Sequence, residues 1–205
     1  MAPDGAADDW FGEIVDIHED TIVIGAYGES DNGEVGGSAH VFVRSGNEWN
    51  HQDKLLSPDR AADDSFESSV TIYGDTIVVG APLDDDNGFH SGSAHVFVRS
   101  GEGWKHQAKL LSSEGAAVDF FRVSAAIYED TIVVCAYGDD DNGGLSGTAQ
   151  VFVRSGEEWT LQVKLLAPDG LNFGLSVAIY GDTIVFGTYG VDNGNYSGSA
   201  QIFVV

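Results

Sequence analysis

The stretch TIVIG at Thr21–Gly25 returns three times, as TIVVG at Thr76–Gly80, TIVVC at Thr131–Cys135 and TIVFG at Thr183–Gly187. The steps between these copies are 55, 55 and 52 residues. A second landmark keeps the same step, with GSAHVFV at Gly37 and Gly92, GTAQVFV at Gly147 and GSAQIFV at Gly198. A period of this length is typical of stacked supersecondary units that share one core. The sequence therefore predicts a structure made of four similar repeats.

Each repeat has the pattern of short β-strands separated by tight turns. In repeat two the strands are predicted at Ser69–Tyr73, Thr76–Ala81, Ser93–Val98 and Trp104–Leu111. A two-residue turn such as Gly74-Asp75 joins the first pair, as in β-hairpins. Valine, isoleucine and phenylalanine occupy both faces of these strands, which favours sheets that are covered on both sides. We therefore predict an all-β fold, a β-propeller of four blades of about 55 residues each.

The four repeats are expected to form a single domain over residues 1–205. The repeats run approximately over residues 1–56, 57–111, 112–166 and 167–205, and the last one lacks the outer strand that carries a tryptophan in the others. An incomplete blade leaves the strand Gly198–Val205 as an open edge, which invites self-association. Three arrangements fit: a closed four-bladed ring with a three-stranded last blade, a half-ring that pairs with another copy, or part of a larger propeller.

The composition limits the classes of partner. The formal net charge is −24, so nucleic acid and anionic membranes would be repelled, whereas cations and basic partners would be attracted. No apolar run reaches the roughly 18 to 20 residues of a membrane helix, and the chain shows no signal peptide. The compartment therefore stays open.

Two short elements resemble a known family. Phe11-Gly12 and Phe173-Gly174 precede Gly-Ala-Tyr or related triplets, and Gly80-Ala81-Pro82 is a full match to the second element. Together with the surrounding consensus, this pattern resembles the FG-GAP repeat of integrin α-subunit propellers and, more closely, bacterial and algal FG-GAP-like arrays. The resemblance implies a propeller that serves binding or cell adhesion at the cell surface or outside the cell.

Acidic residues concentrate in the loops at one end of the predicted blades. The loop after the second strand contains Asp84-Asp85-Asp86-Asn87-Gly88 in repeat two and a similar run in the neighbouring repeats. Alternating carboxylates followed by a turn offer the oxygen ligands that Ca²⁺ prefers. We therefore predict calcium ligands at Glu29, Asp31, Asp84, Asp86, Asn87, Asp139, Asp141 and Asn142. The alternative is that Asp-Asn-Gly forms a turn whose side chains bond to backbone amides.

The resemblance itself does not supply this calcium site. In integrin propellers the calcium loop lies between the FG and GAP elements, where this chain has only a tight hairpin. Arginines Arg44, Arg99 and Arg154 are predicted at the opposite end of the blades, so we expect a polar charge distribution with one strongly negative face.

Several other side chains on the acidic loops are candidates for ligand contact. Aromatic and acidic groups together suit a sugar or peptide surface, and the candidates are Trp10, Asp9, Asp64, Phe89, His90 and Tyr196. By contrast, His40 and His95 share a slot with Gln150 and Gln201, which indicates a structural hydrogen bond.

The leading functional hypothesis is a non-enzymatic binding module for a protein or glycan, with calcium as a cofactor of the acidic loops. No catalytic residue is proposed, because the sequence contains none of the usual catalytic motifs. The alternatives are a hydrolase or lyase with an acidic cleft near Trp10, Asp9 and Asp64, or a structural unit that associates with its own copies.

Overall fold

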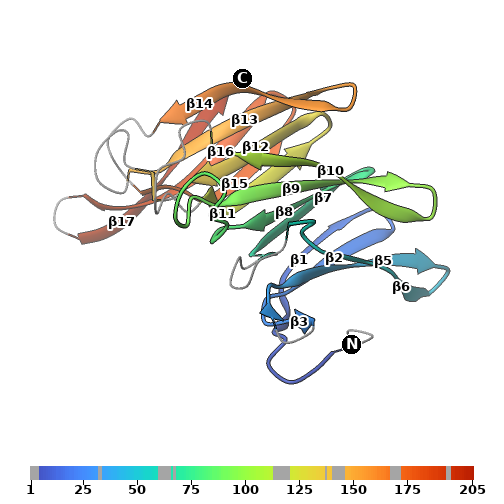
Figure 1. The fold of residues 1–205 in the computed structure, drawn as a ribbon. Coiled ribbons are helices and arrows are strands. Elements are labelled where there is room, and N and C mark those ends of the chain that lie inside the picture. The colour runs from blue at the N-terminus through green and yellow to red at the C-terminus, as the bar shows by residue number, and fades with distance from the viewer. Residues whose placement is uncertain are drawn as a thin grey trace.

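The computed structural model describes residues 5–31, 34–59, 66, 68–112, 121–136, 138–139, 146–166, 172–192 and 195–205, and every regular element of these residues is a β-strand. Apart from one two-stranded hairpin, the strands form four antiparallel sheets that follow one another along the chain (Figure 1). Each sheet is one blade of a four-bladed β-propeller, as the repeats predict.

The first two blades are complete. Blade 1 contains β1 (Phe11–His18), β2 (Thr21–Ala26), β5 (Ser38–Ser45) and β6 (Glu48–Leu55), in that spatial order. Blade 2 contains β7 (Ser69–Tyr73), β8 (Thr76–Ala81), β9 (Ser93–Ser100) and β10 (Gly103–Leu111). A small additional hairpin in the first repeat, which the sequence pattern did not predict, joins β3 (Ser30–Asp31) to β4 (Glu34–Val35).

The last two blades differ in strand number. Blade 3 contains β11 (Phe121–Tyr128), β12 (Thr131–Ala136), β13 (Thr148–Ser155) and β14 (Glu158–Leu166). Blade 4 contains only β15 (Asn172–Tyr180), β16 (Thr183–Asp192) and β17 (Asn195–Val204). The prediction of a last blade without its outer strand is therefore confirmed.

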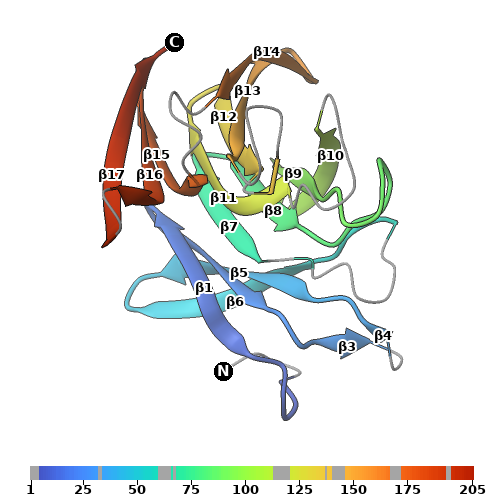
Figure 2. The ribbon, with the colours of Figure 1, turned by 90° about the vertical axis from the view of Figure 1, so that its left-hand side faces the viewer.

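The antiparallel order gives every blade two different ends. At the loop end, β2 leads to β3, β8 leads to β9 and β6 leads to β7. At the hairpin end, short turns join β1 to β2 and β5 to β6, with equivalent turns in the other blades. The first strands β1, β7, β11 and β15 lie toward the middle of the structure, and each contacts the next one in this series (Figure 2).

The hydrophobic core lies between the blades. We call the side of a blade that packs on the preceding blade its leading face, and the side that packs on the following blade its trailing face. Val23 and Val41, on the trailing face of blade 1, are fully buried in one cluster with Val70 and Ile72, on the leading face of blade 2. The same arrangement recurs between blades 2 and 3 and between blades 3 and 4, where Cys135 packs as a small buried hydrophobe. The apolar side chains on both faces of a middle blade are therefore removed from water only when a blade packs on each side.

Aromatic rings continue from blade to blade at the hairpin end. The last residue of each first strand is aromatic, and the rings meet in order: His18 to Tyr73 at 4.6 Å, Tyr73 to Tyr128 at 5.0 Å and Tyr128 to Tyr180 at 4.9 Å between centroids. Farther out, the indole N–H of Trp104 donates to Gln52 of the preceding blade at 3.1 Å. The blades are thus held together by apolar, aromatic and polar contacts that repeat with the sequence.

Candidate functional site

In each of the first three blades, the loop after the second strand has a buried carboxylate near its start. The acid is the first residue of the predicted calcium run, and Glu29, Asp84 and Asp139 are only 5%, 3% and 2% exposed. Each acid comes a few residues after the buried second strand of its blade, where the chain has not yet reached the surface. A buried carboxylate without a partner would be strongly destabilising.

A lysine from the outer strand of the same blade supplies that partner. In blade 2, Lys109 Nζ lies 2.5 Å from Asp84 Oδ2, 2.6 Å from Asp59 Oδ2 and 2.6 Å from Asp86 Oδ2. The ammonium group has three protons, and here it faces three carboxylates. Lys109 on β10 therefore ties together the loop after β8 and the segment that follows β6.

Hydroxyl and imidazole groups complete the site around Asp84. Ser93 Oγ donates to Asp84 Oδ2 at 2.9 Å and lies 3.1 Å from His95 Nε2. The other ring nitrogen of His95, Nδ1, is 3.1 Å from His106 Nε2. His95 is fully buried, so the prediction of a structural hydrogen-bonding role for this slot is confirmed.

Blades 1 and 3 repeat the arrangement with other residue types. In blade 1, Glu29 bonds to Lys54 Nζ at 2.5 Å, to His40 Nε2 at 2.9 Å and to the hydroxyl of Ser38. In blade 3, Asp139 Oδ2 lies 3.0 Å from Lys164 Nζ and accepts a hydrogen bond from Thr148 Oγ1 at 2.8 Å. We call the pairs Glu29–Lys54, Asp84–Lys109 and Asp139–Lys164 the acid–lysine centres.

Blade 4 differs at the position of the buried acid. The sequence has Val191 where the other repeats have Glu29, Asp84 and Asp139. The remaining hydroxyl of that slot, Ser199 Oγ, instead lies 2.5 Å from Thr188 Oγ1.

Several titratable groups in and beside the acid–lysine centres of blades 1 and 2 have shifted pKa values. Burial raises the pKa of Asp59, but hydrogen bonds from Lys109 and Ser57 outweigh this effect and lower the pKa to about 2. Burial, reinforced by the positive charge of Lys109, lowers the pKa of His95 to about 4. In blade 1, burial raises the pKa of Glu29, yet the hydrogen bonds from Lys54, Ser38 and His40 lower it below its ordinary value. At neutral pH the carboxyl groups of Glu29 and Asp59 are thus ionised, and His95 is neutral.

In blade 2, a lysine occupies the place among the acids where the sequence pattern predicted Ca²⁺. Donor atoms of Asp59, Asp84 and His95 lie within 4.8 Å of one another, which is close enough to share an ion. However, Lys109 Nζ already lies among these acids, whereas Ca²⁺ takes six to eight oxygen ligands. The amide of Asn87 donates to Ser112 O at 2.8 Å. A calcium ion at Asp84 must therefore displace a lysine, and calcium binding stays a prediction that requires this exchange.

The other predicted calcium ligands are less fully defined. Asp31 lies in β3, but the structure does not describe its side chain. Asp141 and Asn142 lie outside the described residues, as does Asp64 of the predicted ligand surface. Tyr196 lies in β17, and its side chain is likewise not described.

The structure places two of the predicted ligand contacts on the surface of the loop end. Trp10 is 65% exposed, and its φ of +53°, like the φ of +70° at Asp8, lies in the left-handed region that non-glycine residues rarely adopt. This segment rests on Gly28, where an added Cβ would lie 1.8 Å from the carbonyl oxygen of Asp8. A strained backbone that holds a large aromatic side chain in solvent is typical of functional surfaces.

Phe89 forms a second exposed aromatic group. Its side chain is 61% exposed and stacks on His90, with 3.8 Å between ring centroids and an interplanar angle of 23°. The backbone N–H of His90 donates to Asp85 Oδ1 at 2.6 Å, which fixes the tip of the loop. Asp9, by contrast, is buried, and its carboxylate accepts a hydrogen bond from the amide of Ala6.

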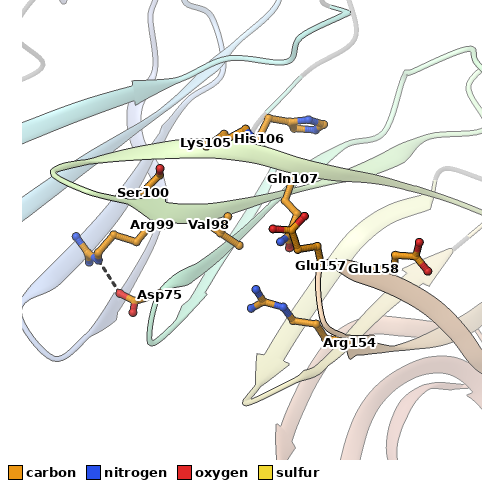
Figure 3. A pocket seen from close by; sticks show the side chains of 10 residues that line it. All are labelled: Asp75, Val98, Arg99, Ser100, Lys105, His106, Gln107, Arg154, Glu157 and Glu158. Carbon is orange, nitrogen blue, oxygen red and sulfur yellow. Dashed lines mark hydrogen bonds and ion pairs between the residues drawn. The ribbon is translucent and has the colours of Figure 1, made fainter.

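The hairpin end contains a mixed-charge cavity of about 740 Å³ between blades 2 and 3 (Figure 3). Arg99, Lys105 and Arg154 line it together with Asp75, Glu157 and Glu158. Arg99 is held by Asp75 Oδ1 at 2.7 Å and lies over the ring of Trp104. The arginines predicted at this end thus lie among acids from the hairpin turns, and the expected contrast in charge between the two ends is smaller than the arginine positions alone suggested.

A family model for the FG-GAP repeat matches residues 1–42, 49–97, 104–152 and 159–203. The chain belongs to the FG-GAP repeat family. The three longer matches begin on β6, β10 and β14, so one FG-GAP unit combines the outer strand of one blade with three strands of the next. Each of these sequence repeats of the FG-GAP propeller therefore spans two neighbouring blades and links them covalently.

One further comparison and one structural search add little to this assignment. No curated protein matches the chain. In the described residues, no helix has the length and apolar character needed to span a membrane.

The lysines of the acid–lysine centres were missed by sequence reasoning. Each lies 25 residues after its acid, at Lys54, Lys109 and Lys164. That shared spacing was the available signal.

Acidification is expected to destabilise the FG-GAP propeller through His95. The folded state binds a proton at this residue only near pH 4, whereas the unfolded chain binds it near pH 6.5, so unfolding takes up a proton between these values. Stability therefore falls as the pH drops from 7 to 4.5, by about 2 to 3 kcal/mol from this group. Urea unfolding across this range measures the effect. His95→Gln, which copies Gln150 of blade 3, should flatten the slope; an unchanged slope would contradict this role of His95.

Calcium is expected to compete with Lys109. Thermal unfolding of chelator-treated protein should shift no more with millimolar Ca²⁺ than with Mg²⁺ at the same ionic strength. The Lys109→Gln variant leaves Asp59, Asp84 and Asp86 without their cation and should gain a calcium-selective rise of the midpoint. Lys105→Gln, a change of the same type on the same strand, is the control. A calcium-selective rise in the unmodified protein would show that the acidic loops bind the ion beside the lysine.

Proposed function

We propose that this FG-GAP propeller is a non-enzymatic binding module whose loop end takes a protein segment with basic side chains. The observation that carries the proposal is Trp10, a 65% exposed indole held by a backbone with two left-handed residues. Solvent exposure and backbone strain both cost free energy in the free protein. A partner that covers the indole would recover part of that cost.

Exposed carboxylates of the loop end favour a basic partner. Asp8, Asp85 and Asp86 are exposed at the loop end of blades 1 and 2, and the whole chain has a net charge of −24. Arginine and lysine side chains form charge-assisted hydrogen bonds with carboxylates and cation–π contacts with the faces of aromatic rings such as Trp10 and Phe89. Long-range attraction would also speed association at low salt. An adhesion role at the cell surface is consistent with the FG-GAP repeat family and belongs to the same proposal.

Binding to an immobilised lysine-rich and arginine-rich peptide set tests the proposal. Trp10→Ala and Phe89→Ala should each weaken binding by about tenfold or more, because central aromatic residues dominate such interfaces. Trp49→Ala, which removes a 40% exposed tryptophan at the hairpin end, should leave binding unchanged. Raised salt should weaken binding of the unmodified protein.

Two results would count against a basic partner. If the peptide set is not bound, or if Trp49→Ala weakens binding as much as Trp10→Ala, the loop end is not this surface. A signal on a glycan array that depends on Trp10 and Phe89, without peptide binding, would reassign the same surface to a sugar.

A further inference from the structure

The two outermost blades each present one uncovered apolar face. On the leading face of blade 1, Val15 and Ile17 are 60% and 58% exposed. The equivalent residues of blade 2, Val70 and Ile72, are 7% and 5% exposed because they pack on blade 1. Blade 1 therefore has the side chains of a blade contact but no blade to receive them.

On the trailing face of blade 4, apolar side chains are likewise left uncovered. Val185 and Ile202 are paired across β16 and β17 and are 37% and 68% exposed, and Val204 is 72% exposed. The equivalent pairs in the other blades are Val23 with Val41, Val78 with Val96 and Val133 with Val151, all of which are fully buried. The same apolar pair is thus covered three times within the chain and left open once.

The aromatic series at the hairpin end is open at the same two places. His18 begins the series in blade 1, and Tyr180 ends it in blade 4 with 78% of its surface exposed. Within the described residues no ring contact joins Tyr180 to His18. In the same part of the chain, β15 packs closely on β11 but not on β1. The chain therefore does not cover its own open faces in this structure.

We propose that a second copy of this chain covers these faces in a head-to-tail contact, with the trailing face of blade 4 in one copy on the leading face of blade 1 in the other. The contact reproduces the packing of blades 1 and 2: Val15 and Ile17 cover Val185 and Ile202, and His18 stacks on Tyr180. Three copies of this packing already exist inside each chain, so the two faces match in shape and chemistry. Such a contact is heterologous, because it joins two different faces. Two copies form a closed ring if blade 4 of each copy packs on blade 1 of the other.

This contact differs from pairing through the open edge of β17. Edge pairing would use the backbone groups of Gly198–Val205 and would not involve β1. The head-to-tail contact uses side chains on both β1 and β17, so substitutions on either strand disrupt it.

Light scattering over a range of concentrations tests the proposal. The unmodified chain of 21.7 kDa should show twice that mass, or larger assemblies of the same contact. Ile17→Glu and Ile202→Glu should each give a monomer, because a charge would enter the apolar contact from an exposed position. Leu161→Glu, a change at a 39% exposed leucine of blade 3, is the control and should retain the assembly. Cooperative thermal unfolding of each variant verifies its fold.

A mixture of the two variants gives the sharpest result. Ile17→Glu copies keep an intact blade 4, and Ile202→Glu copies keep an intact blade 1, so an equimolar mixture should form dimers through one remaining contact. A monomeric unmodified chain would overturn the proposal, whether the ring closes on itself or stays open. An assembly that Ile17→Glu leaves intact would also overturn it, in favour of edge pairing through β17.

Discussion

The charge of a buried carboxylate has to be balanced within the blade, and this constraint organises the loop end of the propeller. Glu29, Asp84 and Asp139 lie at 5% exposure or less, where an ionised acid without a partner would cost several kcal/mol. A lysine from the outer strand of the same blade forms an ion pair with each acid. Because the two groups come from different strands, the ion pair also fixes the loop against the blade. In blade 4 the same position holds Val191, which needs no counter-charge.

The same pairing separates structural acids from those that remain for a partner. Asp84 is committed to Lys109, Ser93 and the turn around it. Asp85 and Asp86 lie farther out and are exposed, although Asp86 also contacts Lys109. These two acids, with the exposed side chains of Trp10 and Phe89 at the same end of the blades, are the groups to which we assign the proposed recognition of a basic segment.

The strands and blades could be predicted from the sequence because their signals are local. Alternating apolar residues and short turns defined β7 and β8 to the residue, and the absent fourth outer strand was visible as a missing tryptophan segment. The acid–lysine centres depend instead on which strands lie side by side, since Lys109 approaches Asp84 only after β8, β9 and β10 have paired. A lysine in an outer strand has the appearance of an ordinary surface residue until that register is known. The uncovered faces were likewise invisible, because Val15 and Val70 have the same identity and differ only in what lies beside them.

A double-mutant cycle on Asp84 and Lys109 tests the mutual dependence of acid and lysine most directly. Lys109→Met alone should lower the free energy of unfolding by about 3 to 5 kcal/mol, since it leaves a buried charge unpaired. Asp84→Val copies the residue found in blade 4, and the double variant should be more stable than the sum of the single losses by about 2 kcal/mol or more. Additive losses would contradict the account, because they would show that the buried acid and the lysine stabilise the blade independently.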